Sequence, residues 1–246
     1  MTRFAIIAAL ESELQPLVKE WKRSTLMVSG KTIPCYASDE AVAVAGGIGS
    51  RWAEAVARTV VGKFNPQVLV SAGLAGALIP SLKVAGIVLP NVIVEAETGT
   101  EYRCDVGGDV IGGGILVTVR EVAGADSKRK LVERFHALLV DMEAASVARV
   151  ALEKGIGYRC VKAISDEAGF VMPPLARFVD VDGHFQQGRF VRWLALRPQH
   201  WASTIALGRN SARASRALCE WLRQNLDTKL QPARVVTLKE AEYSKN

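Results

Sequence analysis

Residues 41–50 read Ala-Val-Ala-Val-Ala-Gly-Gly-Ile-Gly-Ser, and this stretch, with the segments that follow it, decides the fold. Residues 41–45 are apolar on both faces, which predicts a fully buried strand. Ser50 is a suitable N-cap for a helix over 51–64, and the apolar run at 67–71 predicts a second buried strand. A strand, a helix and a second strand in this order indicate an α/β protein.

The same alternation of apolar runs and helical patterns continues along most of the chain. Helices are expected at 11–22 and 143–154, and a turn of small residues is expected at 71–76. Further strands are expected at residues 4–9, 86–90, 92–94, 115–119, 138–142 and 156–164. The predicted sheet is parallel or mixed, and because no repeat or linker divides it, residues 1–226 are expected to form one domain.

The composition is that of a globular chain with a large core. Of the 246 residues, 49% are hydrophobic and 23% are charged, and the mean hydropathy is +0.15, which excludes disordered and collagen-like chains. No run approaches the ~18 apolar residues that a membrane-spanning helix needs. Residues 1–4 lead into a strand rather than into a cleavable leader, so the cytoplasm is the expected location.

Neither the cysteines nor the histidines show the spacing of a metal site. The four cysteines are scattered and form no Cys-x-x-Cys pair, and the three histidines are equally dispersed. We therefore expect buried free thiols, no metal and no cofactor. The residues concerned are Cys35, Cys104, Cys160, Cys219, His136, His184 and His200.

The positive charge is concentrated in the C-terminal quarter. The whole chain carries a net charge of +6, and residues 183–246 hold 11 lysines and arginines against 4 acidic residues. The other 182 residues hold 20 basic residues against 21 acidic ones. Amphipathic helices are expected at 187–196 and 201–226, followed by a polar tail at 227–246. Residues 183–226 are thus predicted to form a basic helical part of the domain.

Carboxylates follow three of the predicted strands, where α/β proteins bind their ligands. They are Glu11, Glu13, Asp141, Glu143, Asp166 and Glu167. In the small-residue turn, Ala72 and Gly73 would let the backbone approach a flat ligand. These features predict a binding pocket, although acidic residues at such positions also suit helix N-termini.

Five motifs in this order resemble the nucleoside phosphorylase and nucleosidase superfamily. They are residues 6–13 (IIAALESE), 47–49 (GIG), 71–76 (SAGLAG), 140–145 (VDMEAA) and 162–166 (KAISD). Within that superfamily, the core is similar to the methylthioadenosine/S-adenosylhomocysteine nucleosidases. The resemblance implies a three-layer αβα fold with a mixed, partly barrel-like sheet. It also implies cleavage of the N-glycosidic bond of a purine nucleoside, with adenine as the expected base.

The resemblance implies a role for each matching residue. Asp166 would be the general acid that protonates the five-membered-ring nitrogen of the leaving purine, with Ser165 orienting it. Glu143 would accept hydrogen bonds from the ribose hydroxyls, and Met142 would pack on the sugar. Glu13 would position or activate the attacking water. These residue types suit the reaction, because breaking the bond builds positive charge on the ribose and negative charge on the base.

The nucleophile, water or phosphate, separates a hydrolase from a phosphorylase. Related phosphorylases hold phosphate with arginine and glycine near the first strand and with arginine and serine around the third. Here the first strand is followed by the acidic residues 11–13, and Ser71 and Leu74 stand at the third strand. Hydrolysis is therefore expected, with a phosphorylase as the alternative and Arg51 as the one nearby cation in its favour. The Gly46–Gly49 turn resembles a phosphate nest but lacks the dinucleotide fingerprint.

Residues 165–174, 182–184 (DGH), 196–198 (LRP) and 206–209 (ALGR) resemble a second branch, the hopanoid-associated phosphorylases, which is linked to removing adenine from an adenosylated lipid. Residues 185–209 interleave apolar and basic side chains, which fits peripheral contact with an anionic membrane. In the alternative, the apolar side chains pack on the core and the arginines face water. The residues are Phe185, Phe190, Trp193, Leu194, Leu196, Trp201 and Ile205, with Arg189, Arg192, Arg197 and Arg209.

Two other classes of protein compete with an enzyme. A catalytically silent nucleoside-binding protein would have no need of the set Glu13, Glu143 and Asp166. A nucleic-acid-binding protein is suggested by the pI of 9.2, but the basic residues lie on helical stretches rather than in an aromatic-lined groove. The expected partners are a small-molecule purine nucleoside and, from the resemblance, a second copy in a homodimer.

Overall fold

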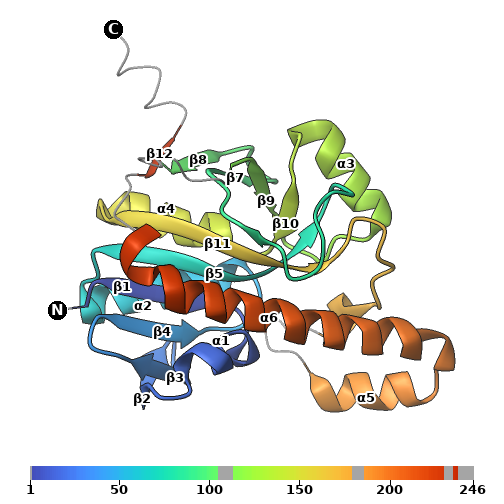
Figure 1. The fold of residues 1–246 in the computed structure, drawn as a ribbon, viewed down its shortest axis with the longest axis horizontal. Coiled ribbons are helices and arrows are strands. Elements are labelled where there is room, and N and C mark those ends of the chain that lie inside the picture. Colours follow the sequence, from blue (N-terminus) through green and yellow to red (C-terminus); the bar gives the residue numbers. More distant parts are fainter. Residues whose placement is uncertain (1, 105–112, 179–185, 230–234, 238–246) are drawn as a thin grey trace, which may run out of the picture.

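One mixed sheet organises the protein in this computed structural model, which describes residues 2–104, 113–178, 186–229 and 235–237 (Figure 1). The strands are β1 (Phe4–Ala8), β2 (Lys22–Val28), β3 (Lys31–Ala37), β4 (Ala41–Ala45), β5 (Val68–Ala77), β6 (Ile87–Val88), β7 (Val92–Glu95), β8 (Glu101–Cys104), β9 (Ile115–Thr118), β10 (Leu139–Asp141), β11 (Gly157–Asp166) and β12 (Val235–Thr237). The helices are α1 (Glu11–Val18), α2 (Ser50–Phe64), α3 (Ala125–Phe135), α4 (Ala144–Lys154), α5 (Gln187–Ala195) and α6 (Trp201–Lys229), with short 3-10 helices η1 (Leu175–Phe178) and η2 (Pro198–His200).

Strand β5 connects the parts of the sheet. Its first residues pair in parallel with β1, and its last two pair antiparallel with β10. Strand β11 pairs in parallel with nearly its whole length, and β6 pairs antiparallel with β11. The described strands form an open sheet with β12 at one end of the strand order and β2 at the other. The partly barrel-like sheet that was expected is therefore not a closed barrel.

Alternate residues of β1 show how the sheet is covered on both faces. Ala5 and Ile7 belong to a buried cluster with side chains of α2 and α4, whereas Phe4 and Ile6 belong to a second cluster with side chains of α1 and α6. Because neighbouring residues of a strand point to opposite faces, the two clusters are the two sides of one sheet. The predicted α/β class and the three αβα layers are therefore confirmed. All four cysteines are buried free thiols, as expected.

The region after the first helix differs from the prediction. The helix expected over 11–22 ends at Val18, and residues 22–37 form the antiparallel hairpin of β2 and β3. Ser29 and Gly30 make its turn, with φ of 48° and 81°. Two consecutive positive φ angles match the right-handed twist of the hairpin strands, which is why glycine follows serine here.

Two local predictions around the glycine-rich segments were wrong. Residues 71–76 are not a turn but the second half of β5, because pairing with β11 continues through Gly76. The N-cap of α2 is Gly49 rather than Ser50. The hydroxyl of Ser50 instead donates a hydrogen bond to the carbonyl of Met142, at 2.9 Å. In both cases a contact distant in sequence overrides the local preference.

The C-terminal helices fall into two parts. The second half of α6 packs on the sheet through Ala214, Leu218 and Leu222, which are fully buried. The first half of α6 and all of α5 extend away from the sheet (Figure 1). The predicted tail at 227–246 begins inside α6, and β12 pairs with β8; its remaining residues lie outside the described ranges. None of the described helices is long and apolar enough to cross a membrane.

Candidate active site

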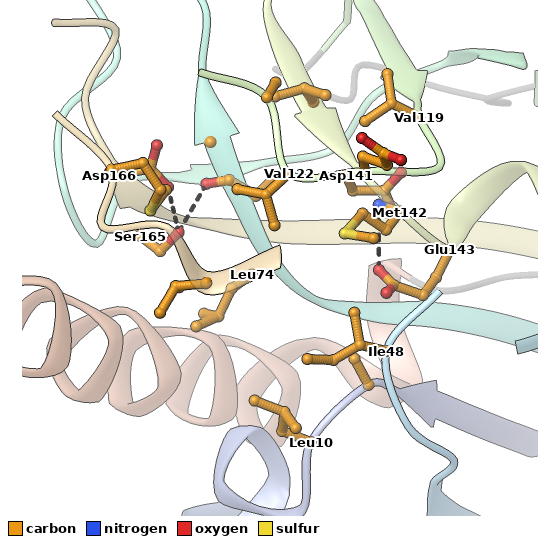
Figure 2. A pocket seen from close by; sticks show the side chains of 18 of the residues that line it. Leu10, Ile48, Leu74, Val119, Val122, Asp141, Met142, Glu143, Ser165 and Asp166 are labelled. Atoms are coloured by element: carbon orange, nitrogen blue, oxygen red, sulfur yellow. Dashed lines mark hydrogen bonds between the residues drawn. The ribbon is translucent and has the colours of Figure 1, made fainter. Parts of the chain in front are cut away.

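A cavity of about 190 Å³ lies at the ends of β1, β5, β10 and β11, and the segments that follow these strands also line it. Figure 2 shows Ser165 and Asp166 at one end of this cavity and Met142 and Glu143 at the other. Its lining residues are Ala9, Leu10, Glu13, Ile48, Leu74, Ala75, Gly76, Val119, Glu121, Val122, Ala123, Lys128, Val140, Asp141, Met142, Glu143, Ser165, Asp166, Met172 and Leu175. The cavity thus brings together five of the residues predicted from the sequence, and they come from three of the motifs: Glu13 from 6–13, Met142 and Glu143 from 140–145, and Ser165 and Asp166 from 162–166.

Asp166 ends β11 and is held on both carboxylate oxygens. The hydroxyl of Ser165 donates to Oδ1 at 2.7 Å, and Nζ of Lys128 donates to Oδ2 at 2.5 Å. The lysine also donates to the backbone carbonyl of Glu167 at 3.2 Å. The Asp166 and Lys128 side chains are 3% and 5% exposed, so this ion pair is almost fully removed from water.

Glu143 is the N-cap residue of α4, at the opposite end of the cavity. Its Oε1 accepts a hydrogen bond from the backbone N–H of Gly49 at 2.8 Å, and its Oε2 accepts from that of Met142 at 3.3 Å. Burial raises the pKa of this carboxyl to about 7, and the nearby Asp141 carboxylate adds to the rise. The backbone N–H of Gly49, at the end of the glycine turn, thus helps to fix the Glu143 carboxylate.

Glu13 lies in the first turn of α1 and is 5% exposed. Its Oε2 accepts hydrogen bonds from the backbone N–H groups of Ala9 at 3.2 Å and Leu10 at 3.4 Å. Burial raises its pKa to about 7, against the opposing effect of the Lys162 ammonium. A carboxyl that titrates near neutral pH can exchange a proton with water, which is the property a general base needs.

Asp141 and Lys162 form a second buried ion pair, with Nζ 2.8 Å from Oδ2. The other oxygen of Asp141 accepts a hydrogen bond from the Thr118 hydroxyl at 2.7 Å. Burial lowers the pKa of Lys162, but Asp141, Cys160 and Glu143 together outweigh this effect and the pKa is raised. Lys162 thus remains a cation between Asp141 on one side and Glu13 on the other.

Two of the three predicted carboxylate pairs have only one member in the cavity, whereas both members of the third pair, Asp141 and Glu143, line it. Glu11 lies outside the cavity and accepts a hydrogen bond from the Tyr36 hydroxyl. Glu167 forms an ion pair with the exposed Lys83, with 3.3 Å between Oε2 and Nζ. Asp141 lines the cavity but is engaged by Lys162. Sequence spacing alone could not separate the two members of a pair, because both follow the same strand.

The small-residue segment contributes in a different way from the one expected. Among the described residues, the cavity wall is built by Leu74, Ala75 and Gly76, and Ala72 and Gly73 do not line it. Gly73 instead lies behind the wall, where a Cβ would come within 3.1 Å of Glu13 Oε2. Gly73 therefore leaves room for Glu13, and its predicted contact with the ligand stays a prediction.

Two cations were missed by the sequence analysis as members of the site. Lys162 carries a signal that could have found it, because a lysine in the middle of a strand predicted to be buried has to be paired. Lys128 carries none, since it lies in a helix whose sequence is that of a surface helix. Arg51, the cation that could have favoured phosphate, is exposed and is not part of this cavity, as expected for a solvent-facing residue.

The arrangement places an acid–hydroxyl–lysine group at one end of the cavity and a carboxylate at the other. A family model described as the phosphorylase superfamily matches residues 3–118 and 109–187. The chain belongs to the phosphorylase superfamily. The match covers all the strands that shape the cavity and every predicted site residue.

Relatives within the superfamily agree with this assignment. The 5′-methylthioadenosine/S-adenosylhomocysteine nucleosidase of Geobacillus thermodenitrificans is 27% identical over 198 residues, which cover 67% of this chain and 84% of that protein. Among solved structures, a 5′-methylthioadenosine/S-adenosyl homocysteine nucleosidase of Helicobacter pylori has a TM-score of 0.69 and 15% identity, covering 92% of this chain and 98% of that one. The futalosine hydrolase of Helicobacter pylori has a TM-score of 0.68 and 17% identity, covering 92% and 97%. These structures establish the fold.

Proposed function

We propose that the protein is an N-glycosidase that hydrolyses the bond between ribose and base in a purine nucleoside, with adenine as the base. The observation that supports this most directly is one buried cavity with Asp166 at one end and Glu143 at the other (Figure 2). The Geobacillus relative, a nucleosidase by name, supports the same reaction. The apolar lining from Leu10, Ile48 and Leu175 supports a substrate with an apolar 5′ substituent.

In the proposed reaction, Asp166 is the general acid that protonates the leaving group. The glycosidic bond breaks with its electron pair passing to the purine, and the carboxyl of Asp166 protonates the five-membered-ring nitrogen. Ser165 holds Oδ1 of Asp166 and so fixes the orientation of the acid. A general acid at this position is worth about 10²–10⁴-fold in rate.

At the sugar end, Glu143 accepts hydrogen bonds from the ribose hydroxyls and Met142 packs against the sugar. The carboxylate also stabilises the positive charge that develops on the ribose, in a site with little water. Glu13 positions the attacking water and takes up its proton. Its pKa of about 7 supports this role, because the carboxylate form is then populated at neutral pH and can still accept a proton.

Water is the proposed nucleophile. Of the described residues that line the cavity, Lys128 is the only cation, and its ammonium is occupied by Asp166 and Glu167. A phosphate dianion would therefore meet Glu13 and Glu143 without a free arginine to neutralise it. A phosphate-dependent phosphorylase is the alternative.

Incubation with methylthioadenosine, adenosine and inosine, each with and without phosphate, tests this function. Hydrolysis predicts a free ribose sugar and a free base in the absence of phosphate. Strict phosphate dependence with ribose 1-phosphate as product would establish the phosphorylase instead. Nucleoside binding without turnover of any substrate would identify a silent binding protein.

A second proposal concerns the surface of α5 and α6, which we propose contacts an anionic membrane, as an enzyme of an adenosylated lipid would need. The exposed apolar side chains Val191, Leu196, Trp201 and Ile205 support it, together with the arginines around them. Phe190, by contrast, is buried against Phe178, and Arg197 stacks on Trp193. Only part of the predicted apolar set is thus available for a lipid surface, and Phe185 lies outside the described residues.

Co-sedimentation with vesicles containing an anionic lipid tests this contact. Removal of the chain after residue 174 is unsuitable, because it deletes Leu218 and Leu222 of the core. The matched change is Trp201→Glu with Ile205→Glu, which leaves the buried half of α6 intact. Salt-sensitive binding that this variant loses would support the proposal, and wild-type protein that stays in the supernatant at low salt would contradict it.

We also propose a cytoplasmic homodimer. The four buried free thiols suit a reducing compartment, and the dimer follows from the resemblance of the core to nucleosidases. Light scattering coupled to size-exclusion chromatography should give twice the chain mass of 26.5 kDa. The mass of a single chain across micromolar concentrations would contradict the dimer.

A further inference from the structure

Lys128 is the only buried residue of α3, and it is charged. The helix docks on the sheet through Leu131, Val132 and Phe135, which pack half-buried against a separate apolar cluster. These three contacts would hold the helix without the lysine. Burial of an ammonium costs desolvation free energy even when it is paired, so a contribution to stability does not explain why Lys128 is buried.

The partners of Lys128 all belong to the acid end of the cavity. Its Nζ donates to Asp166 Oδ2 at 2.5 Å and to the carbonyl of Glu167 at 3.2 Å, and its side chain lines the cavity itself. Ser165 occupies the other oxygen of Asp166. The carboxylate of Asp166 is therefore held by two donors from two different elements, α3 and β11.

Gly76 provides the space for this ion pair. A Cβ at this position would come within 2.9 Å of Asp166 Oδ2 and within 3.4 Å of Lys128 Nζ. A contact of 2.9 Å is shorter than packed atoms allow, so the carboxylate could not keep its place beside any larger residue. The absence of a side chain at Gly76 thus leaves room for the Asp166 carboxylate, and Lys128 lies next to the same space.

We propose that Lys128 is a positioning residue for the leaving-group acid: it orients Asp166 and holds the proton that Asp166 passes to the departing base. This inference rests on the proposed glycosidase function. It extends that function, because Nζ of Lys128 donates a hydrogen bond directly to Oδ2 of Asp166 and so lies where it can supply a proton to the acid.

The protons and electrons of the proposed step balance. A proton passes from Lys128 Nζ to Asp166 Oδ2 and on to the purine nitrogen, while the electron pair of the glycosidic bond moves to the purine. Lys128 is left as a neutral amine and Asp166 as a carboxylate. The attacking water gives its proton to Glu13. When the products leave, Glu13 releases that proton to solvent and Lys128 takes one up.

The test compares Lys128→Met, which keeps the length but removes the charge, with Asp166→Asn and with the double variant. We expect Lys128→Met to lower kcat for the nucleoside about 100-fold with little change in KM, within the range of a general acid. The double variant should be no slower than Asp166→Asn alone, because Lys128 acts through Asp166. Lys130→Met, an exposed lysine of the same helix, is the matched control and should retain the wild-type rate.

A substrate with an activated leaving group separates proton supply from a structural role. A 4-nitrophenyl riboside releases nitrophenolate, which needs no proton, so Lys128→Met should lose less than about threefold in kcat on it. An equal loss on both substrates would show that the lysine only maintains the structure, and would overturn the proposal. Wild-type kcat in Lys128→Met, or losses that multiply in the double variant, would overturn it as well.

The double variant also serves as a control for misfolding of Lys128→Met. The double variant removes both charges, so it leaves no unpaired ion in the core, and its comparison with Asp166→Asn stands even where Lys128→Met does not fold. A wild-type enzyme that releases no base from any nucleoside would end the proposed function and this inference together. An active wild type with an unaffected Lys128→Met would end this inference alone.

Discussion

Nζ of Lys162 in β11 lies 2.8 Å from Oδ2 of Asp141 in β10, and the two side chains are 2% and 0% exposed. Loss of one partner of such a pair destabilises the fold strongly, because the remaining charge is buried and unpaired. We expect Lys162→Met to lower the free energy of unfolding by about 3–5 kcal/mol, measured by urea denaturation.

The surface pair Arg129–Asp126, at 3.0 Å, provides the matched comparison. Its side chains are exposed, so Arg129→Met should change the free energy of unfolding by less than about 0.5 kcal/mol. Lys162→Met combined with Asp141→Asn should recover part of the loss. Similar effects of Lys162→Met and Arg129→Met would show that the buried pair contributes no more than a surface one.

The titration of Glu13 should make the stability depend on pH. The pKa of about 7 in the folded protein lies above the ordinary value of 4.5, so the folded state keeps this proton where the unfolded state has lost it. The contribution of Glu13 to stability is therefore fully present below about pH 4.5 and is lost as the pH rises to 7. We expect Glu13→Gln to gain on the order of 3 kcal/mol relative to wild type between pH 4.5 and pH 8. A difference that stays constant with pH would contradict the buried titration.

Asp166→Asn should keep the fold and the binding of nucleoside but lose most turnover. The amide cannot donate the leaving-group proton as the carboxyl does, and we expect kcat to fall at least 100-fold. Single-turnover kinetics with binding measured in parallel separate the two effects. If the variant retains more than about a tenth of the wild-type kcat, Asp166 is not the acid.

Glu143→Gln should weaken discrimination between ribose and 2′-deoxyribose substrates. A carboxylate accepts from both ribose hydroxyls, whereas the amide of glutamine is part donor and part acceptor. The ratio of kcat/KM for adenosine and 2′-deoxyadenosine should fall about tenfold, which corresponds to one hydrogen bond of about 1.4 kcal/mol. An unchanged ratio would move the ribose contact to another residue.

The two halves of α6 should respond differently to truncation of a side chain. Leu218 is fully buried in the core, so Leu218→Ala should destabilise the protein by about 2–5 kcal/mol. Ile205 lies on the same helix and is 54% exposed, and Ile205→Ala should change stability by less than about 0.5 kcal/mol. Thermal unfolding of both variants measures the difference, and equal losses would mean that the first half of α6 is also packed.

The layers of the fold and the ends of the site followed from features that are local in sequence. Buried strands such as β4 consist of apolar residues on both faces, and Asp166 is the last residue of the buried strand β11. Because strand ends meet at one edge of a sheet, the three carboxylate pairs could be assigned to one pocket before any contact was known, and the family resemblance selected Glu13, Glu143 and Asp166 from them.

The remaining features depend on partners that are distant in sequence. Lys128 reaches Asp166 across 38 positions, and the sequence of its helix favours exposure of every charged residue. The hairpin of β2 and β3 was missed because helical and strand patterns overlap at residues 19–24, and only the Ser29-Gly30 turn signals it. Residues 71–76 form a strand because they pair with β11, and a prediction from local propensity does not include this pairing.

The close approach at Gly76 affects how related sequences are to be interpreted. A single methyl group there would displace the acid of the site while every charged residue remained in the sequence. A homologue with counterparts of Glu13, Glu143 and Asp166 but with alanine in place of this glycine could therefore not hold its acid in the position described here. In such a lineage, the position of the acid depends on a residue that carries no functional group at all.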